Sequence, residues 1–125
     1  MKFDWKSYIQ LSEKLLSWSE ISLEEARLRT ALSRCYYGVF CIARNKLIAK
    51  GINIPKVDTH KFVREKYQTS PDTTEKKIAK NLRRLWNDRI EADYENEANI
   101  NLQRAKVAIE LAKRTLKELQ KLNRG

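Results

Sequence analysis

Apolar residues recur every three or four positions along nearly the whole chain, the spacing that places them on one face of an α-helix. No stretch of useful length alternates as a half-buried strand would. The pattern predicts an all-α protein, an up-and-down bundle of about five helices that forms a single domain over residues 1–125. Asp4 can cap the first helix, which should end near Ser19. Its expected buried face is made of Tyr8, Leu11, Leu15 and Trp18.

The second predicted helix is nearly thirty residues long and ends at Gly51, where a left-handed backbone suits glycine. Its core stripe consists of Leu28, Ala31, Leu32, Cys35, Tyr36, Val39, Ile42 and Ala43. A different side of this helix carries Arg27, Arg34, Gly38 and Cys41. Because a small residue such as Gly38 lets another backbone come close, this side could meet a second subunit or a ligand, or it could face solvent.

Capping residues divide the second half of the chain into three further helices. A short helix is expected from Thr59 to Tyr67, and Asp72 with Glu75 forms a capping pair that opens the fourth. Asn96 can cap the last helix. His60 falls in the first turn of the short helix, where a lone histidine is more often a surface or capping-region residue than a catalyst.

The fourth helix carries an arginine where its apolar stripe predicts a leucine. The stripe is formed by Ile78, Leu82, Leu85 and Trp86. Helical spacing places Arg89 in the middle of it, and a buried guanidinium needs a carboxylate, a ligand or a wet interface. The carboxylates within reach in the sequence are Asp88, Glu91 and Asp93. The alternative is that the helix reaches the end of the protein here and Arg89 extends into water.

The chain is strongly basic, with a formal net charge of +10 and a pI near 9.8. Such a charge favours polyanions such as RNA, DNA or an acidic partner, although it also serves solubility alone. The candidates for nucleic-acid contact are Arg34, Lys76, Lys80, Arg83 and Arg84. They could follow a phosphate backbone or form a solvated face.

Several kinds of chemistry are excluded by the residues that the chain lacks. Cys35 and Cys41 are too far apart along one helix to form a disulfide, and with one histidine no zinc-binding set can be assembled. The chain also has no glycine-rich phosphate loop and no stretch of transmembrane length. We therefore expect a cytoplasmic protein with reduced thiols, no metal, no cofactor and no membrane association.

One cluster of polar residues remains as a candidate catalytic site, formed by Arg89, Asp88, Asp93 and Tyr94. An arginine can stabilise charge that develops on a phosphate, and an aspartate or a tyrosine can orient a hydroxyl group. Metal-free RNA cleavage by a 2′-hydroxyl would require these two functions. The same four residues could instead form a buried polar lock.

Two segments resemble those of HEPN domain proteins. Residues 31–40, A-L-S-R-C-Y-Y-G-V-F, are similar to the family's A-L-S-R-A-Y-Y-A-x-F helix, and residues 85–94, L-W-N-D-R-I-E-A-D-Y, are similar to its L-x-x-x-R-x-x-A-D-Y segment. The resemblance extends over roughly Ala26 to Ala112. It implies a helical bundle that commonly dimerises, with the polar motif of each subunit near the dimer axis.

The resemblance also implies three possible functions. Many members are metal-independent ribonucleases or toxins whose arginine is followed four to six residues later by a histidine, a place where this chain has Tyr94. Other members, of the R-x-x-A-D-Y type, are encoded with a small nucleotidyltransferase-like partner, and some bind nucleic acid or nucleotides without cutting. The chain is thus expected to be an RNA-binding or partner-binding component of a toxin–antitoxin or defence system. The alternatives are a ribonuclease that uses Arg89 at the interface of a homodimer, and a purely structural dimerisation subunit.

Overall fold

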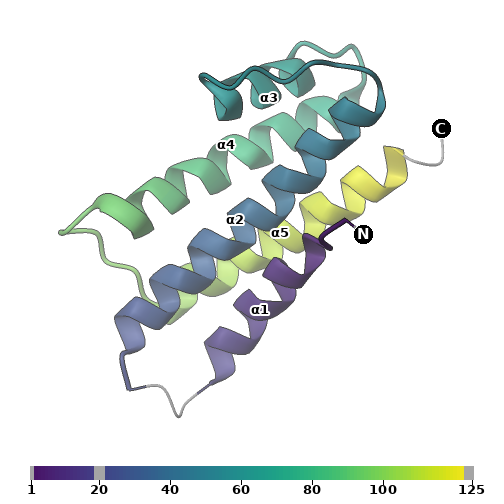
Figure 1. Cartoon of the computed structure of the whole chain (residues 1–125). Helices are drawn as coiled ribbons and strands as arrows, with labels where there is room; N and C mark the ends of the chain where they lie inside the picture. The colour runs from purple at the N-terminus through teal and green to yellow at the C-terminus, as the bar shows by residue number, and fades with distance from the viewer. Residues whose placement is uncertain (1, 19–21, 123–125) are drawn as a thin grey trace.

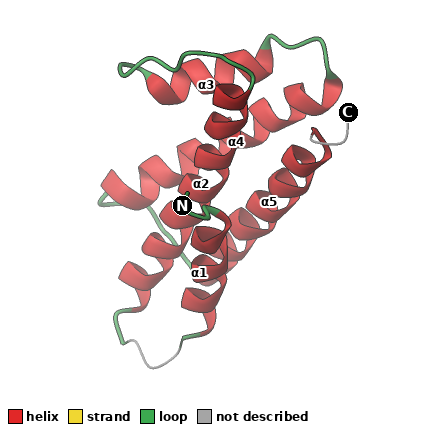
Figure 2. Cartoon of the chain, turned by 45° about the vertical axis from the view of Figure 1, so that its right-hand side comes forward, coloured by secondary structure: helices red, strands yellow, loops and turns green. Residues whose placement is uncertain are grey.

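The computed structural model describes residues 2–18 and 22–122, and within these ranges it contains five α-helices and no strand. The helices are α1 (Lys6–Ser17), α2 (Glu24–Ala49), α3 (Thr59–Gln68), α4 (Thr73–Tyr94) and α5 (Leu102–Lys121). This confirms the prediction of an all-α bundle. The long helices α1, α2, α4 and α5 alternate in direction, and the short α3 lies on the outer side of α4 (Figures 1 and 2).

Helix α2 is the centre of the bundle, because it contacts each of the other four helices. Most of its predicted core stripe is buried, and Tyr36, Val39 and Ala43 have no exposed surface. The helix ends at Ala49, and Gly51 has the left-handed backbone that its position predicted, with a φ of +87°. Helix α2 therefore fixes the positions of the other four helices, including α4, against which the candidate site is built.

Helix α1 buries Leu15, as predicted, but the rest of its buried face is rotated from the predicted one. Ile9, Ser12 and Leu15 are buried, whereas Leu11 and Trp18 are 41% and 50% exposed. Ser19, where the helix was expected to end, lies outside the described residues.

Gly38 of α2 explains this rotation of α1. A Cβ atom on Gly38 would come within 2.9 Å of the Trp5 carbonyl oxygen and 3.0 Å of Ile9 Cγ1. The two helices thus touch at a point where no side chain fits, and Ile9 packs into the notch. Helix α1 of the same chain therefore covers α2 at Gly38, and Cys41, one turn further along, is also buried.

An aspartate caps the N-terminus of α4, and an asparagine caps the N-terminus of α5. Asp72 accepts a hydrogen bond from the Glu75 backbone N–H at 3.0 Å, as predicted. The cap of α5 is Asn101, which accepts from the Arg104 N–H at 2.8 Å, so the prediction that Asn96 caps the last helix was wrong. The reason is Ile100, which is 3% exposed: burying this side chain just before the cap fixes where the chain enters the helix.

Candidate functional site

Arg89 lies on the buried face of α4, where the periodicity placed it, and is 8% exposed. Its Nε donates to Oδ2 of Asp93, one turn further along α4, at 2.7 Å. The same Oδ2 atom accepts from the Ser33 hydroxyl of α2 at 3.1 Å. The alternative in which Arg89 extends into water is therefore wrong, and one carboxylate shared between two helices compensates the buried charge.

Aromatic rings enclose the rest of the Arg89 guanidinium. Its Cζ atom lies 4.9 Å from the ring centroid of Tyr37, 5.2 Å from Trp86 and 5.4 Å from Tyr94. Nη2 donates to the Tyr94 hydroxyl at 3.5 Å. Of the three guanidinium nitrogens, Nη1 has no hydrogen-bond acceptor within the described residues. The electron-rich ring faces stabilise the cation and leave this edge for a further acceptor.

Arg34 of α2 completes the cluster. Its Cζ atom lies 4.8 Å from the ring centroid of Tyr37 and 5.2 Å from that of Tyr8, and its Nη2 donates to the Ser33 hydroxyl at 3.4 Å. Tyr37 is therefore in contact with the guanidinium groups of both Arg34 and Arg89. We call Arg34, Tyr37, Arg89, Asp93 and Tyr94 the Arg89 cluster. It holds two cations against one carboxylate.

Two of the acidic residues near Arg89 in sequence have a different partner. Asp88 accepts from Nη2 of Arg104 on α5 at 3.2 Å, and Glu91 pairs with the same nitrogen. Arg29 of α2 also holds this end of α4, because its guanidinium donates to the backbone carbonyls of Glu91 and Ala92 at 3.2 and 3.0 Å. The structure thus brings Asp93 and Tyr94 to Arg89, and it places Asp88 in the contact between α4 and α5.

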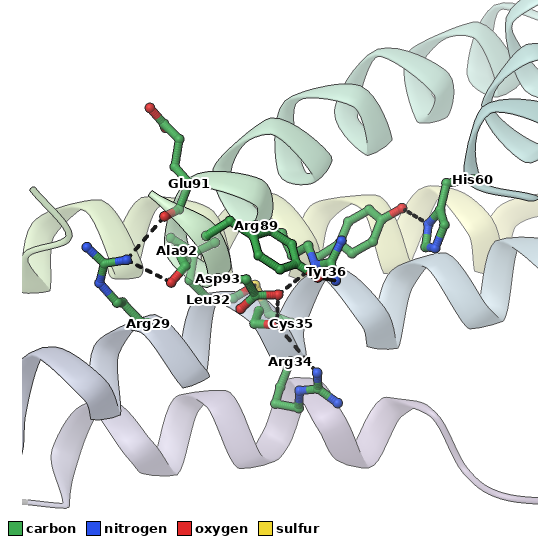
Figure 3. A network of polar contacts seen from close by, with 12 residues as sticks. Arg29, Leu32, Arg34, Cys35, Tyr36, His60, Arg89, Glu91, Ala92 and Asp93 are labelled. Atoms are coloured by element: carbon green, nitrogen blue, oxygen red, sulfur yellow. Dashed lines mark hydrogen bonds and ion pairs between the residues drawn. The ribbon is translucent and has the colours of Figure 1, made fainter. Parts of the chain in front are cut away.

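His60, which the sequence predicted to be a surface or capping-region residue, lies beside this cluster (Figure 3). Its Nδ1 forms a hydrogen bond with the Tyr36 hydroxyl at 2.6 Å, and its ring stacks on Phe40 at a centroid distance of 4.0 Å. The ring of Trp86 lies 4.6 Å away. Burial, followed by the charges of nearby arginines including Arg89, lowers the pKa of His60 to about 4. The imidazole is therefore neutral near pH 7.

No local sequence pattern could have predicted these contacts of His60. Its contact with Tyr36 joins two residues that are 24 positions apart, on α2 and α3. In Figure 3 the Tyr36–His60 pair lies on one side of Arg89 and Arg29 on the other. The candidate site is thus a row of cationic and aromatic side chains between α2 and α4.

The basic residues of α4 line two hollows on either side of that helix. One is a pocket of about 480 Å³ between α3 and α4, lined in part by Lys76, Lys80 and Arg83. The other is a groove of about 620 Å³ between α4 and α5, to which Arg84 contributes. Sequence reasoning missed the basic residues that the neighbouring helices add: Lys61 and Arg64 from α3, and Arg114, Lys117 and Lys121 from α5. The sequence patterns of α3 and α5 do not show that these residues face α4.

Within residues 2–18 and 22–122, no group of three or more histidine, cysteine or acidic side chains is placed so that it could hold a metal ion. No helix of the structure, over the same residues, is long and apolar enough to cross a membrane.

Two comparisons with known proteins bear on this geometry. The family described as the HEPN domain matches residues 5–122. The chain is also similar to the "Putative toxin MJ0605" of Methanocaldococcus jannaschii, with 28% identity over 126 residues that cover 91% of this chain and 90% of that protein.

Proposed function

The chain belongs to the HEPN domain family, and we propose that it binds RNA as a component of a toxin–antitoxin or defence system. The name of the Methanocaldococcus relative supports the toxin-related part of this proposal. In the same proposal the protein is a homodimer of the R-x-x-A-D-Y type with a small nucleotidyltransferase-like partner.

The Arg89 cluster is the observation that carries the RNA-binding proposal. It combines the guanidinium groups of Arg34 and Arg89 with aromatic rings, and Asp93 is its single carboxylate. Arginines bind phosphate oxygens, and aromatic rings stack on unpaired bases, so that the two together suit a single strand. Tyr94 is 66% exposed, which leaves its ring accessible to a base.

Binding can be tested by fluorescence anisotropy with a labelled single-stranded RNA at 50 and 200 mM salt. We expect affinity to fall with salt, because phosphate contacts release counterions, and to fall at least tenfold in Arg34→Gln. Lys106→Gln is the matched control, because Lys106 is an exposed residue of α5 and the variant loses the same charge. Equal affinity in the two variants, or no binding by the wild type, would remove the Arg89 cluster from consideration as an RNA site.

A second candidate function is metal-independent RNA cleavage. It is favoured by the 3.5 Å contact between Arg89 Nη2 and the Tyr94 hydroxyl, which places a cation and a hydroxyl group at one site. Arg89 would hold the scissile phosphate, while Asp93 or Tyr94 orients the ribose 2′-hydroxyl that attacks it. Asp88 takes no part in this version, since it is paired with Arg104.

The two functions differ in their products. Incubation of the purified protein with RNA in EDTA would give fragments that end in a 2′,3′-cyclic phosphate if the protein cleaves. Tyr94→Phe, which changes an exposed residue and should fold normally, would then slow cleavage about a hundredfold or more if the Tyr94 hydroxyl orients the attacking group. Binding without fragments would leave the protein as a binding component, and sedimentation of the same sample would report the homodimer. A dimer that neither binds nor cleaves RNA would be a structural subunit.

A further inference from the structure

Arg64 of α3 is a half-buried arginine without an acceptor. It forms no hydrogen bond or ion pair with any described residue, and its Nη1 atom is fully buried without a hydrogen-bond acceptor. The other buried and half-buried arginines of the described chain each donate to an oxygen atom. Those arginines are Arg27, Arg29, Arg34, Arg44, Arg89 and Arg104.

The packing around Arg64 does not neutralise its charge. Its guanidinium carbon lies 5.5 Å from the ring centroid of Trp86, a contact that stabilises a cation but supplies no acceptor. The charge also acts on its surroundings, since Arg64 is one of the arginines that lower the pKa of His60. An uncompensated, partly desolvated guanidinium disfavours the folded protein unless an anion binds to it.

Arg64 lines the pocket between α3 and α4, whose other charged residues are almost all basic. These residues are Lys61, Lys76, Lys80, Arg83 and Glu65. Glu65 is the one acidic residue among them, and its Oε1 atom lies 4.0 Å from Nζ of Lys61. Five cations therefore face one carboxylate in a space of about 480 Å³. This charge balance suits an anion with several oxygens.

The remaining walls of the pocket suit the rest of a nucleotide. Trp86 supplies aromatic surface, and Gln68 and Asn87 supply amide groups that can donate and accept hydrogen bonds at the edge of a base. Trp86 also belongs to the surroundings of Arg89, whose guanidinium carbon lies 5.2 Å from the same ring. Trp86 thus lies between the pocket and Arg89, so a strand bound at the Arg89 cluster can continue into the pocket.

We infer that the pocket between α3 and α4 binds the phosphate group of a nucleotide, with Arg64 as its principal donor. The group could belong to a single-stranded RNA or to a free nucleotide. For the first source, this inference rests on the proposed RNA-binding function; for the second, it stands independently.

The test compares Arg64→Gln with Lys117→Gln, a variant that loses the same charge from the groove between α4 and α5. Titration calorimetry would use three probes: a single-stranded RNA ten nucleotides long, ATP, and inorganic phosphate. We expect Arg64→Gln to weaken RNA or ATP at least tenfold and Lys117→Gln to change either by less than threefold. Arg64→Lys should restore part of the affinity, because it keeps the charge but loses the guanidinium fork.

The arms of the experiment separate the two sources and the two hypotheses. Loss of RNA affinity alone assigns the site to a phosphodiester of the strand, and loss of ATP affinity alone assigns it to a free nucleotide. If Arg34→Gln weakens RNA and Arg64→Gln weakens neither RNA nor ATP, the inference is wrong while the proposed function stands. If the wild type binds ATP through Arg64 but binds no RNA, the inference stands and the proposed RNA-binding function is wrong. No binding of any probe by the wild type would overturn the inference.

A stability measurement excludes a merely structural role for Arg64. Since the residue has no oxygen partner in the described structure, Arg64→Gln should unfold at the same urea concentration as the wild type or at a higher one. A large decrease in that midpoint, together with unchanged binding, would show that Arg64 serves the fold instead.

Discussion

Replacing Asp93 by asparagine should destabilise the protein by about 2 kcal/mol, because it leaves the charge of Arg89 without its carboxylate. Breaking a buried ion pair costs about 3–5 kcal/mol, whereas an exposed pair contributes about 0.2–1 kcal/mol. The Arg89 side chain is 10% exposed and that of Asp93 is 25% exposed, which places this pair between the two limits. The aromatic rings around Arg89 remain in the variant and retain part of the stabilisation.

The assay is urea unfolding followed by circular dichroism at 222 nm. It compares the wild type with Asp93→Asn, with Arg89→Met and with the variant that carries both substitutions. We expect a coupling energy of about 2 kcal/mol in the double-mutant cycle and a melting temperature about 8 °C lower in Asp93→Asn. Glu110→Gln is the control, since it removes the same charge from an exposed pair with Lys113, and it should change stability by less than about 0.5 kcal/mol. If Asp93→Asn is as stable as this control, the carboxylate does not compensate Arg89 and the reasoning fails.

Three further predictions concern His60, Gly38 and the two cysteines. Burial, followed by nearby arginine charges, lowers the pKa of His60 from 6.5 to about 4, so between these pH values the unfolded chain binds a proton that the folded protein does not. The free energy of unfolding should therefore fall as the pH drops from about 6.5 to 4, by about 1–2 kcal/mol once solvent screening is allowed for. His60→Phe should flatten this part of a plot of the urea midpoint against pH. An unchanged plot would contradict the lowered pKa of His60. Gly38→Ala should destabilise the protein by about 2 kcal/mol in the same urea assay, because its Cβ would lie 2.9 Å from the Trp5 carbonyl oxygen, and a neutral effect would mean that α1 can shift without cost. Burial raises the pKa of the Cys35 thiol to about 12 and also raises that of Cys41, so neither should react with Ellman's reagent at pH 8 until guanidinium is added; rapid reaction of the native protein would show that this region opens.

Sequence periodicity predicted the features that depend on one helix at a time. The stripe of α4 located Arg89 on a buried face, since a period of 3.6 residues determines which side chains share a face. The cap at Asp72 and the left-handed Gly51 were also predicted, because each depends on backbone groups within a few residues. The resemblance to HEPN proteins led to the family to which the chain belongs.

Packing between helices decided what periodicity left open. The face of α1 depends on the notch at Gly38, and the start of α5 at Leu102 depends on the burial of Ile100, neither of which a capping or spacing rule contains. Periodicity also could not choose among the three carboxylates near Arg89, because the choice depends on Arg104 of α5 holding two of them.

The composition of the candidate sites was determined by the same long-range contacts. His60 meets Tyr36 across 24 positions, and Arg64 reaches Trp86 from a different helix. A sequence read alone shows which residue types are present and which share a helical face. The tertiary structure decides which of them meet, because each contact requires two helices to be oriented by the whole core, and only then does an arginine have an acceptor or lack one.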